Sequence, residues 1–177
     1  MTSFPHRLMG AAVFDVATYE EVEHDSTATA QAFAIVLLSS LAIGVGATGF
    51  SSRAWSNLFL LSAAAVAGWM AWALVTLSVG GRLLPEPDTE VDVGELLRTL
   101  GFSTAPGLLC VVGIFPILTI PVFAITVPWM LASMIVAVRQ ALDYHSTMRA
   151  IGVCVLGWLL AAVVFVVMGV LFAPRVS

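Results

Sequence analysis

Few side chains in this sequence have the types and spacing that chemistry requires. The three histidines, His6, His24 and His145, lie in separate stretches, so none forms a ligand pair at helical spacing. Asp143 and His145 flank Tyr144, but the sequence places neither a serine or cysteine nucleophile nor a third metal ligand against them. Glycine pairs occur without the strand context and the lysine of a phosphate-binding loop. We therefore expect no enzyme activity, no cofactor and no bound metal.

The composition identifies the class of protein that must position the remaining polar side chains. Of the 177 residues, 60% are hydrophobic and only 10% are charged, and the mean hydropathy is +1.02. A soluble domain carries about 25% charged residues, so these charges are too few to cover a water-facing globule. The acidic clusters at 15–25 and 86–95 produce the net charge of −4. This balance does not predict nucleic-acid binding, which needs a basic stripe.

The hydrophobic residues fall in long runs, which predict an all-α, polytopic transmembrane bundle. Because one span needs roughly 20 apolar residues, we expect five spans within a single membrane domain, 28–173. An interfacial segment, 1–27, precedes that domain and a short tail, 174–177, follows it. The predicted spans cover about 28–48, 57–79, 104–118, 121–142 and 148–172.

The number of spans depends on a charge-free run of 37 residues, 102–138. One straight helix of that length would rise about 55 Å, which is far more than a bilayer needs. We expect two spans joined by a tight turn, with Pro121 in the first turn of the second helix, where a missing N–H has no consequence. Four spans and one re-entrant segment remain the alternative.

Two capping boxes predict short helices outside the spans. Thr18 and Glu21 have the spacing that satisfies the free N–H groups at a helix start, and so do Asp92 and Glu95. Apolar residues follow Glu95, with Arg98 among them, which indicates a surface helix that leads into the third span. Glu95 and Arg98, three residues apart, could also pair, and an exposed pair of this kind contributes only a few tenths of a kcal/mol.

Polar residues at the span ends form a candidate docking face, either for a partner or for segments of the chain itself. Charges of both signs can pair there and hold the segments on the bundle, and we favour this internal role. The residues of this face are Tyr19, Glu20, Glu23, Arg98, Arg139, Asp143, Tyr144 and Arg149. A separate ladder of small residues, Ala63, Ala67 and Ala71, has the spacing of four that lets a second helix approach, as in a bundle interior.

The distribution of arginine predicts the orientation, because the chain contains no lysine. With five spans, one side of the membrane holds Arg7, Arg82, Arg98, Arg139 and Arg149, and the other holds Arg53 and Arg175. By the positive-inside rule, the N-terminus is cytoplasmic and the C-terminus lies outside.

The chain resembles the Yip domain family of Rab-interacting membrane proteins, and in particular its compact prokaryotic members. The resemblance is carried by the acidic segment FDVATYEEVEHDSTATAQA, by the loop-to-span stretch ELLRTLGFSTAPGLL and by the polar turn VRQALDYHSTMRAI. It implies five transmembrane helices, a cytoplasmic N-terminus and, for a prokaryotic member, the cytoplasmic membrane. Eukaryotic members act in vesicle trafficking, Rab binding and membrane shaping. The long N-terminal region of those members is missing here, so we do not expect Rab binding.

Three functions remain open at this stage. We expect a non-enzymatic scaffold or adaptor that contacts membrane lipids and binds other membrane proteins. The alternatives are an accessory subunit of a larger membrane complex and a small passive transporter or channel. The predicted spans contain no Asp, Glu, Lys or His, which disfavours proton-coupled transport. A passive path would need hydroxyl groups to line it, but such hydroxyls more often bond to carbonyls within their own helix or join helices. The hydroxyl residues in the spans are Ser39, Ser40, Ser62, Thr126 and Ser133.

Overall fold

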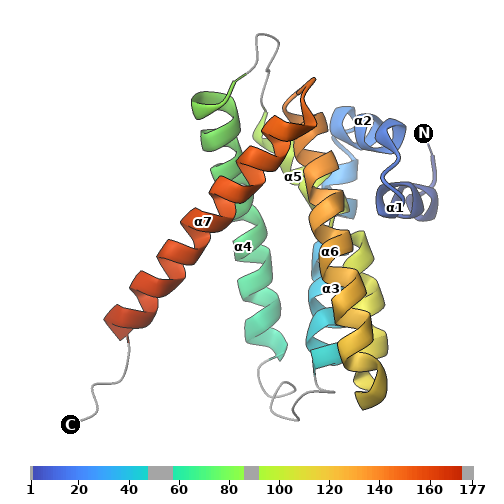
Figure 1. The fold of residues 1–177 in the computed structure, drawn as a ribbon. Coiled ribbons are helices and arrows are strands. Elements are labelled where there is room, and N and C mark those ends of the chain that lie inside the picture. Colours follow the sequence, from blue (N-terminus) through green and yellow to red (C-terminus); the bar gives the residue numbers. More distant parts are fainter. Residues whose placement is uncertain (1, 48–57, 86–91, 173–177) are drawn as a thin grey trace.

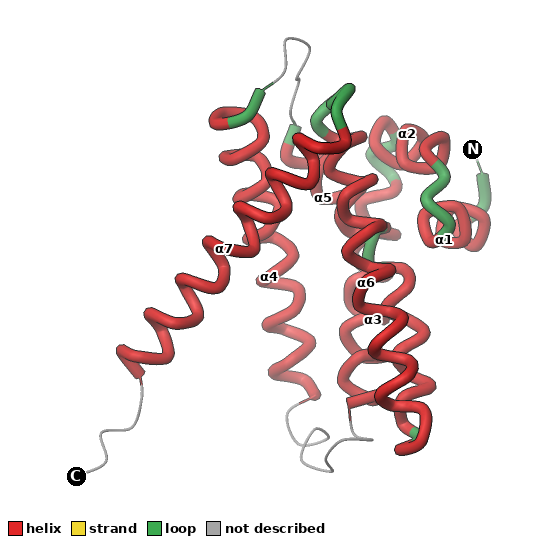
Figure 2. The backbone as a smooth tube through the Cα atoms, in the orientation of Figure 1, coloured by secondary structure: helices red, strands yellow, loops and turns green. Residues whose placement is uncertain are grey.

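The protein is a bundle of helices, as the sequence predicts. The computed structural model describes the backbone of residues 2–47, 58–85 and 92–172, and the side chains of these except 58–65, 161–162 and 164–172. Over these ranges the chain forms helices joined by short turns and contains no strand (Figure 2). The all-α prediction is confirmed.

Two short helices form the N-terminal unit, which we define as α1 (Phe4–Ala12) and α2 (Val16–His24). They pack beside the upper end of the bundle in Figure 1, against α5, α6 and η3. The predicted capping box at Thr18 and Glu21 is wrong, because α2 begins at Val16. The Thr18 hydroxyl instead donates to Asp15 Oδ2 (2.6 Å), and Glu21 is used elsewhere. Phe14, between the helices, turns the chain with a positive φ of 65°.

The first two spans lie close to their predicted positions. The first is α3 (Ala28–Ala47), and the second is α4 (Leu58–Ser78), which continues into a π-helical turn, η2 (Val79–Leu83). Both sequences are apolar around the whole helix circumference, as expected of a helix surrounded by protein and lipid.

The segment that follows is interior, and this corrects the predicted surface helix. Helix α5 (Val93–Phe102) packs against α2, α3, α4 and α6, and most of its residues from Leu96 onward are buried. A 3₁₀ helix, η3 (Ala105–Ile114), extends it, so Val93–Ile114 as a whole is long and apolar enough to cross a membrane. Gly101 explains the burial, because a Cβ there would lie 2.7 Å from the Ala32 Cβ of α3.

The 37-residue run does form two antiparallel segments, but they join at a different proline. Helix α6 (Pro116–Ala141) begins at Pro116, so the predicted start at Pro121 is wrong by five residues. Pro121 and Pro128 lie inside α6. An interior proline is tolerated in a membrane helix when neighbouring groups satisfy the freed carbonyls. At the joint, the Thr119 hydroxyl donates to the Gly113 carbonyl at 2.7 Å.

The last helix, α7 (Thr147–Phe172), diverges from the bundle toward its C-terminal end (Figure 1). The chain thus passes up and down in the order α3, α4, α5–η3, α6 and α7, with α1 and the end of α7 at opposite ends. Four described segments qualify as membrane spans, namely 28–47, 66–83, 93–114 and 116–141, and the described side chains of α7 form a shorter apolar stretch, 147–160. This architecture is compatible with five spans.

Candidate functional site

The polar face predicted from the sequence lies at the end of the bundle where α2, α5 and the turn after α6 meet. Helix α5 starts at this end because the Asp92 carboxylate caps it, accepting from the N–H groups of Gly94 (2.8 Å) and Glu95 (3.2 Å). The second capping box is therefore confirmed in its N-cap residue. The cap fixes the register of α5 and places Arg98 on the side that α2 covers.

Arg98 holds the C-terminal end of α2. Its Nε donates to the carbonyls of Val22 and Glu23, both at 3.0 Å, and Nη2 donates to the Glu23 carbonyl as well. Only 8% of the side chain is exposed. A cation at the last carbonyls of a helix satisfies acceptors without internal partners and matches the negative end of the helix dipole. The predicted pair with Glu95 is not formed, because Arg98 turns to these carbonyls instead.

Tyr144 fastens the turn between α6 and α7 to the end of α4. Asp143 has a positive φ of 51°, which reverses the chain after Ala141 and directs the next side chain inward. The buried Tyr144 hydroxyl lies 2.9 Å from the Gly80 carbonyl and 2.7 Å from the Leu84 carbonyl, both at η2. Arg139 Nε donates to the Tyr144 carbonyl at 3.3 Å. The turn is thereby a fixed platform.

Tyr19 fastens the N-terminal unit to α6. Its fully buried hydroxyl lies 3.2 Å from the Ala11 carbonyl and 3.5 Å from the Ser133 carbonyl. Burial raises the pKa of this phenol far above its usual value, so it stays neutral and acts as a hydrogen-bond donor. The Trp129 indole N–H donates to the Ala12 carbonyl at 2.7 Å and holds the end of α1 in the same way.

A polar hollow of about 470 Å³ opens between α2 and the turn. Glu20, Arg139, Asp143 and His145 are exposed around it, and Gln140 Nε2 donates to Glu20 Oε1 at 3.4 Å. The residues that line it are Val16, Glu20, Arg139, Gln140, Asp143, Tyr144 and His145. Charges of both signs from two helices and one turn therefore face the same space.

Glu23 lies behind this hollow as a buried carboxyl, with 4% of its surface exposed. Burial raises its pKa to about 7, and the nearby charges of Asp143 and Glu95 add to the shift. At neutral pH this carboxyl is therefore protonated in a large fraction of molecules.

The sequence did not reveal Arg7, which organises the N-terminal unit. Only 2% of Arg7 is exposed, and its Nη2 pairs with Glu21 Oε1 (2.9 Å) and Asp25 Oδ2 (2.6 Å). Its Nη1 donates to Gln31 Oε1 at 3.3 Å, which ties α1 to α3. Thr2 donates to both Glu21 oxygens through its N–H (2.8 Å) and its hydroxyl (2.5 Å). One signal was available, because Arg7 is the single basic residue among the five acids of 1–27.

The structure thus divides the predicted face into two sets. Tyr19, Arg98 and Tyr144 are buried and hold the chain together through main-chain carbonyls rather than the ion pairs expected, and the side chain of Glu23 is buried as well. Glu20, Arg139 and Asp143 surround the hollow. Arg149 lies apart from them, where Nη1 donates to the Pro85 carbonyl at 2.8 Å.

The alanine ladder faces outward, which corrects its assignment to the bundle interior. Ala67 and Ala71 are exposed on α4, and the side chain of Ala63 lies outside the described residues. The buried face of α4 is formed instead by residues such as Ala73 and Thr76.

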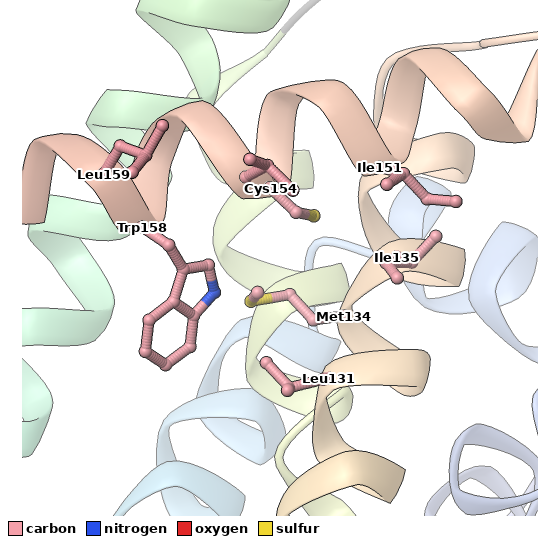
Figure 3. Close-up of a pocket in the computed structure, with 8 residues that line it drawn as sticks. Leu131, Met134, Ile135, Ile151, Cys154, Trp158 and Leu159 are labelled. Atoms are coloured by element: carbon pink, nitrogen blue, oxygen red, sulfur yellow. The ribbon is translucent and has the colours of Figure 1, made fainter.

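An apolar groove of about 480 Å³ separates α6 from α7 below the polar face. In Figure 3, Leu131, Met134 and Ile135 of α6 face Ile151, Cys154 and Trp158 of α7 across this space. The groove carries no charged residue among those that line it. It lies between two of the apolar helices of the bundle.

The described residues contain no group of three His, Cys, Asp or Glu side chains arranged to hold a metal ion. Compared with known proteins, the chain matches the sequence profile of the Yip1 domain over residues 12–168. No curated protein matches the chain, and no solved structure does.

Proposed function

This chain belongs to the Yip1 domain family of integral membrane proteins, and from that premise we propose that it is a non-enzymatic scaffold or adaptor. It binds partner proteins, or organises the surrounding lipid, through the polar face at one end of the bundle. The membrane-associated role follows from the family and from the apolar helices. The adaptor role rests on the construction of the polar face.

The observation that carries the proposal is the hollow lined by Glu20, Arg139 and Asp143. Exposed charges gain little from one another in water, so they remain available to a partner. The surface beneath them is fixed by Arg98 and Tyr144, each buried and hydrogen-bonded to a different helix end. A rigid surface loses little conformational entropy on binding, which favours recognition.

We place the polar face in the cytoplasm, in a prokaryotic cytoplasmic membrane. The elements that carry Arg7, Arg82, Arg98, Arg139 and Arg149 begin or end at the same end of the bundle (Figure 1). Arg53 and Arg175, assigned to the other side, lie outside the described residues. An excess of arginine in the cytoplasmic loops is the usual orientation signal.

A pull-down from native membranes in mild detergent, analysed by mass spectrometry, tests this function. A variant with Glu20→Gln, Arg139→Gln and Asp143→Asn removes the charges of the hollow and should lose at least 10-fold of any partner that the wild type retains. His6→Ala, which changes an exposed residue on α1, is the matched control and should retain it. A wild-type chain that purifies alone and leaves the shape of reconstituted vesicles unchanged contradicts the proposal.

One observation favours the accessory-subunit alternative. Ala67 and Ala71 form an exposed small-residue strip on α4, and such strips let helices of different subunits approach closely. Ala67→Leu with Ala71→Leu should release a stoichiometric membrane subunit if this alternative is right. The adaptor function predicts unchanged capture by this variant.

The hydroxyl groups disfavour the transport alternative. Ser39 donates to the Thr104 carbonyl at 2.9 Å, and Ser40 donates to the Val36 carbonyl at 2.6 Å. These two hydroxyls join helices or bond within one helix, as the sequence predicts, whereas the buried Ser133 Oγ has no hydrogen-bond partner among the described residues. Solute flux in liposomes that contain the purified chain would establish transport instead.

A further inference from the structure

The carboxyl of Glu23 is buried, and one of its oxygens, Oε2, is inaccessible to solvent and has no hydrogen-bond partner among the described residues. Arg98 contacts the Glu23 carbonyl of the main chain, not its side chain. A buried, ionised carboxylate without a partner is strongly unfavourable, so this position tolerates the protonated form better.

The charges that act on Glu23 are mostly of its own sign, and they come from α5, from the turn after α6 and from α2 itself. Asp143 acts on it from the turn and Glu95 from α5, while Glu20 and His24 lie on α2 itself. Of these four, only His24 favours the ionised form. The carboxyl therefore lies where α2, α5 and the turn converge.

The nearby cations are engaged with other groups. Arg98, on α5, directs Nε and Nη2 to the main-chain carbonyls at the end of α2. Arg7, on α1, binds Glu21 and Asp25. Arg139, at the end of α6, donates through Nε to the Tyr144 carbonyl. None of these contacts neutralises an ionised Glu23.

We propose that Glu23 is a proton-dependent latch that regulates the polar face. When its carboxyl is protonated, the end of α2 stays packed against α5 and the turn. When it ionises, repulsion from Asp143 and Glu95 and the loss of hydration loosen α2, and the hollow between α2 and the turn changes shape. This regulation rests on the proposed adaptor function, because it acts on the surface assigned to partners.

The direction of the effect follows from proton linkage. In the docked state the pKa of Glu23 is raised to about 7 from the usual 4.5, so the docked state binds the proton more tightly. Docking is therefore fully favoured below about pH 4.5 and weakens as pH rises toward 7. Above about pH 7 both states have lost the proton and the weakening is complete. Between these limits the docking equilibrium changes by up to about 10-fold per pH unit.

The test measures the distance between α2 and α5 in the full chain, held in lipid nanodiscs. Nitroxide labels are attached to Ala17→Cys on α2 and Val93→Cys on α5, both exposed positions, after the buried Cys110 and Cys154 are replaced by alanine. Pulsed electron paramagnetic resonance should give a narrow distribution of label-to-label distances at pH 5, and a broader distribution or a longer mean distance at pH 8. Identical distributions at both pH values overturn the latch.

Three variants assign the effect to this carboxyl. Glu23→Gln, which cannot ionise, should keep the narrow distribution at pH 8. Asp143→Asn removes the largest opposing charge and should move the transition to lower pH. His24→Gln removes the one nearby charge that favours ionisation and should move the transition to higher pH without abolishing it. A transition that persists in Glu23→Gln, or disappears in His24→Gln, overturns the assignment.

A second measurement separates this inference from the proposed function. Partner capture by the wild type is compared at pH 5.5 and pH 8, with Glu23→Gln alongside. Capture that changes at least 3-fold with pH in the wild type but not in the variant supports regulation by the latch. Capture that is independent of pH overturns the regulation, while the adaptor function stands.

Discussion

The N-terminal unit and α7 are positioned by opposite means. The unit consists of two nine-residue helices, and helices this short are unstable alone. It is held by hydrogen bonds and ion pairs of the buried Arg7 and Tyr19 of its own and of the half-buried Trp129 of α6. Helix α7 has 26 residues, yet it diverges from the bundle and exposes large apolar side chains such as Val155 and Leu159.

The two regions are held differently because the N-terminal unit borders water, whereas α7 is surrounded by hydrocarbon. At the membrane surface, both the burial of apolar groups and directed hydrogen bonds stabilise the docked unit relative to an undocked unit in water. Within hydrocarbon, lipid is as apolar as leucine, so burial gives helices little reason to associate and close steric fit must do so. Helix α7 shows this fit at Gly157, against which the Trp72 ring of α4 packs. Its polar anchors lie at its start, near Tyr144 and Arg149.

The largest expected effect comes from Arg7→Met, which breaks the polar centre of the N-terminal unit. The substitution leaves Glu21 and Asp25 without their cation and should destabilise the docked unit by about 2–3 kcal/mol. This value is below that for a fully buried pair because Glu21 reaches solvent. Hydrogen exchange should rise in α1 and α2 but remain unchanged in α7. Equal loss of protection in α7 would show that the two regions are not independent.

Acid should release the N-terminal unit selectively. Hydrogen bonds from Thr2, then from Arg7, lower the pKa of Glu21 to about 2. Hydrogen bonds from Thr27, then from Arg7, lower the pKa of Asp25 to about 2. Stabilisation from both carboxylates is present above about pH 4.5 and is lost as pH falls toward 2.

The pKa of Glu23 is raised in the docked state, whereas the pKa values of Glu21 and Asp25 are lowered. Docking of the unit should therefore be strongest at about pH 4–5. The same nitroxide pair, followed from pH 2.5 to pH 8, measures this optimum. Arg7→Met should remove part of the acid-side loss, since Thr2 and Thr27 still bond to the carboxylates, and should leave the alkaline-side loss in place. A single monotonic pH dependence in the wild type contradicts the opposed effects.

Substitution of one glycine in the N-terminal unit and one in α7 tests how much each region depends on close steric fit. A Cβ at Gly10 would lie 2.1 Å from Thr18 Oγ1 and 2.9 Å from Thr18 Cβ, inside the tight contact between α1 and α2. Gly10→Ala should therefore destabilise the unit by about 1–3 kcal/mol. A Cβ at Gly157 would lie 2.6 Å from the edge of the Trp72 ring, and lipid allows α7 to move aside. Gly157→Ala should change thermal stability in detergent by less than about 1 kcal/mol, and the reverse order contradicts the comparison.

The sequence predicted the spans well where one physical signal dominated. Uninterrupted apolar runs located α3 and α4, because exposed backbone in lipid must be helical. The joint in the 37-residue run was misplaced because proline fits both the first turn of a helix and, in a membrane, its interior. Pro116 takes the first role and Pro121 the second. The burial of α5 was missed because it depends on which helices cover it, and a sequence pattern does not specify that.

The polar face was predicted in its membership but not in its contacts. Arg98 and Tyr144 were recognised as polar residues at span ends, yet both bind main-chain carbonyls, which every residue carries. A main-chain carbonyl acceptor cannot be identified from the sequence, whereas a carboxylate partner can, because only Asp and Glu carry one. Arg7 was missed for a related reason. Five acidic residues nearby in the sequence are possible ion-pair partners, and which of them pair with Arg7 depends on how α1 packs on α2.

Tyr144→Phe removes a single hydroxyl group and tests the anchor of α7. It removes a hydroxyl that bonds to the end of α4 at Gly80 and Leu84, and it keeps the aromatic ring in place. One lost hydrogen bond to a buried carbonyl should reduce thermal stability in detergent by about 1 kcal/mol. The loss should not depend on pH between 5 and 8, because no ionisable group is removed in that range. The N-terminal unit should keep its nitroxide distance, since Tyr19 and Arg98 hold it through different contacts. If Tyr144→Phe instead loosens α2, the turn transmits structure between the two regions, and the polar face acts as one cooperative unit rather than two separately held parts.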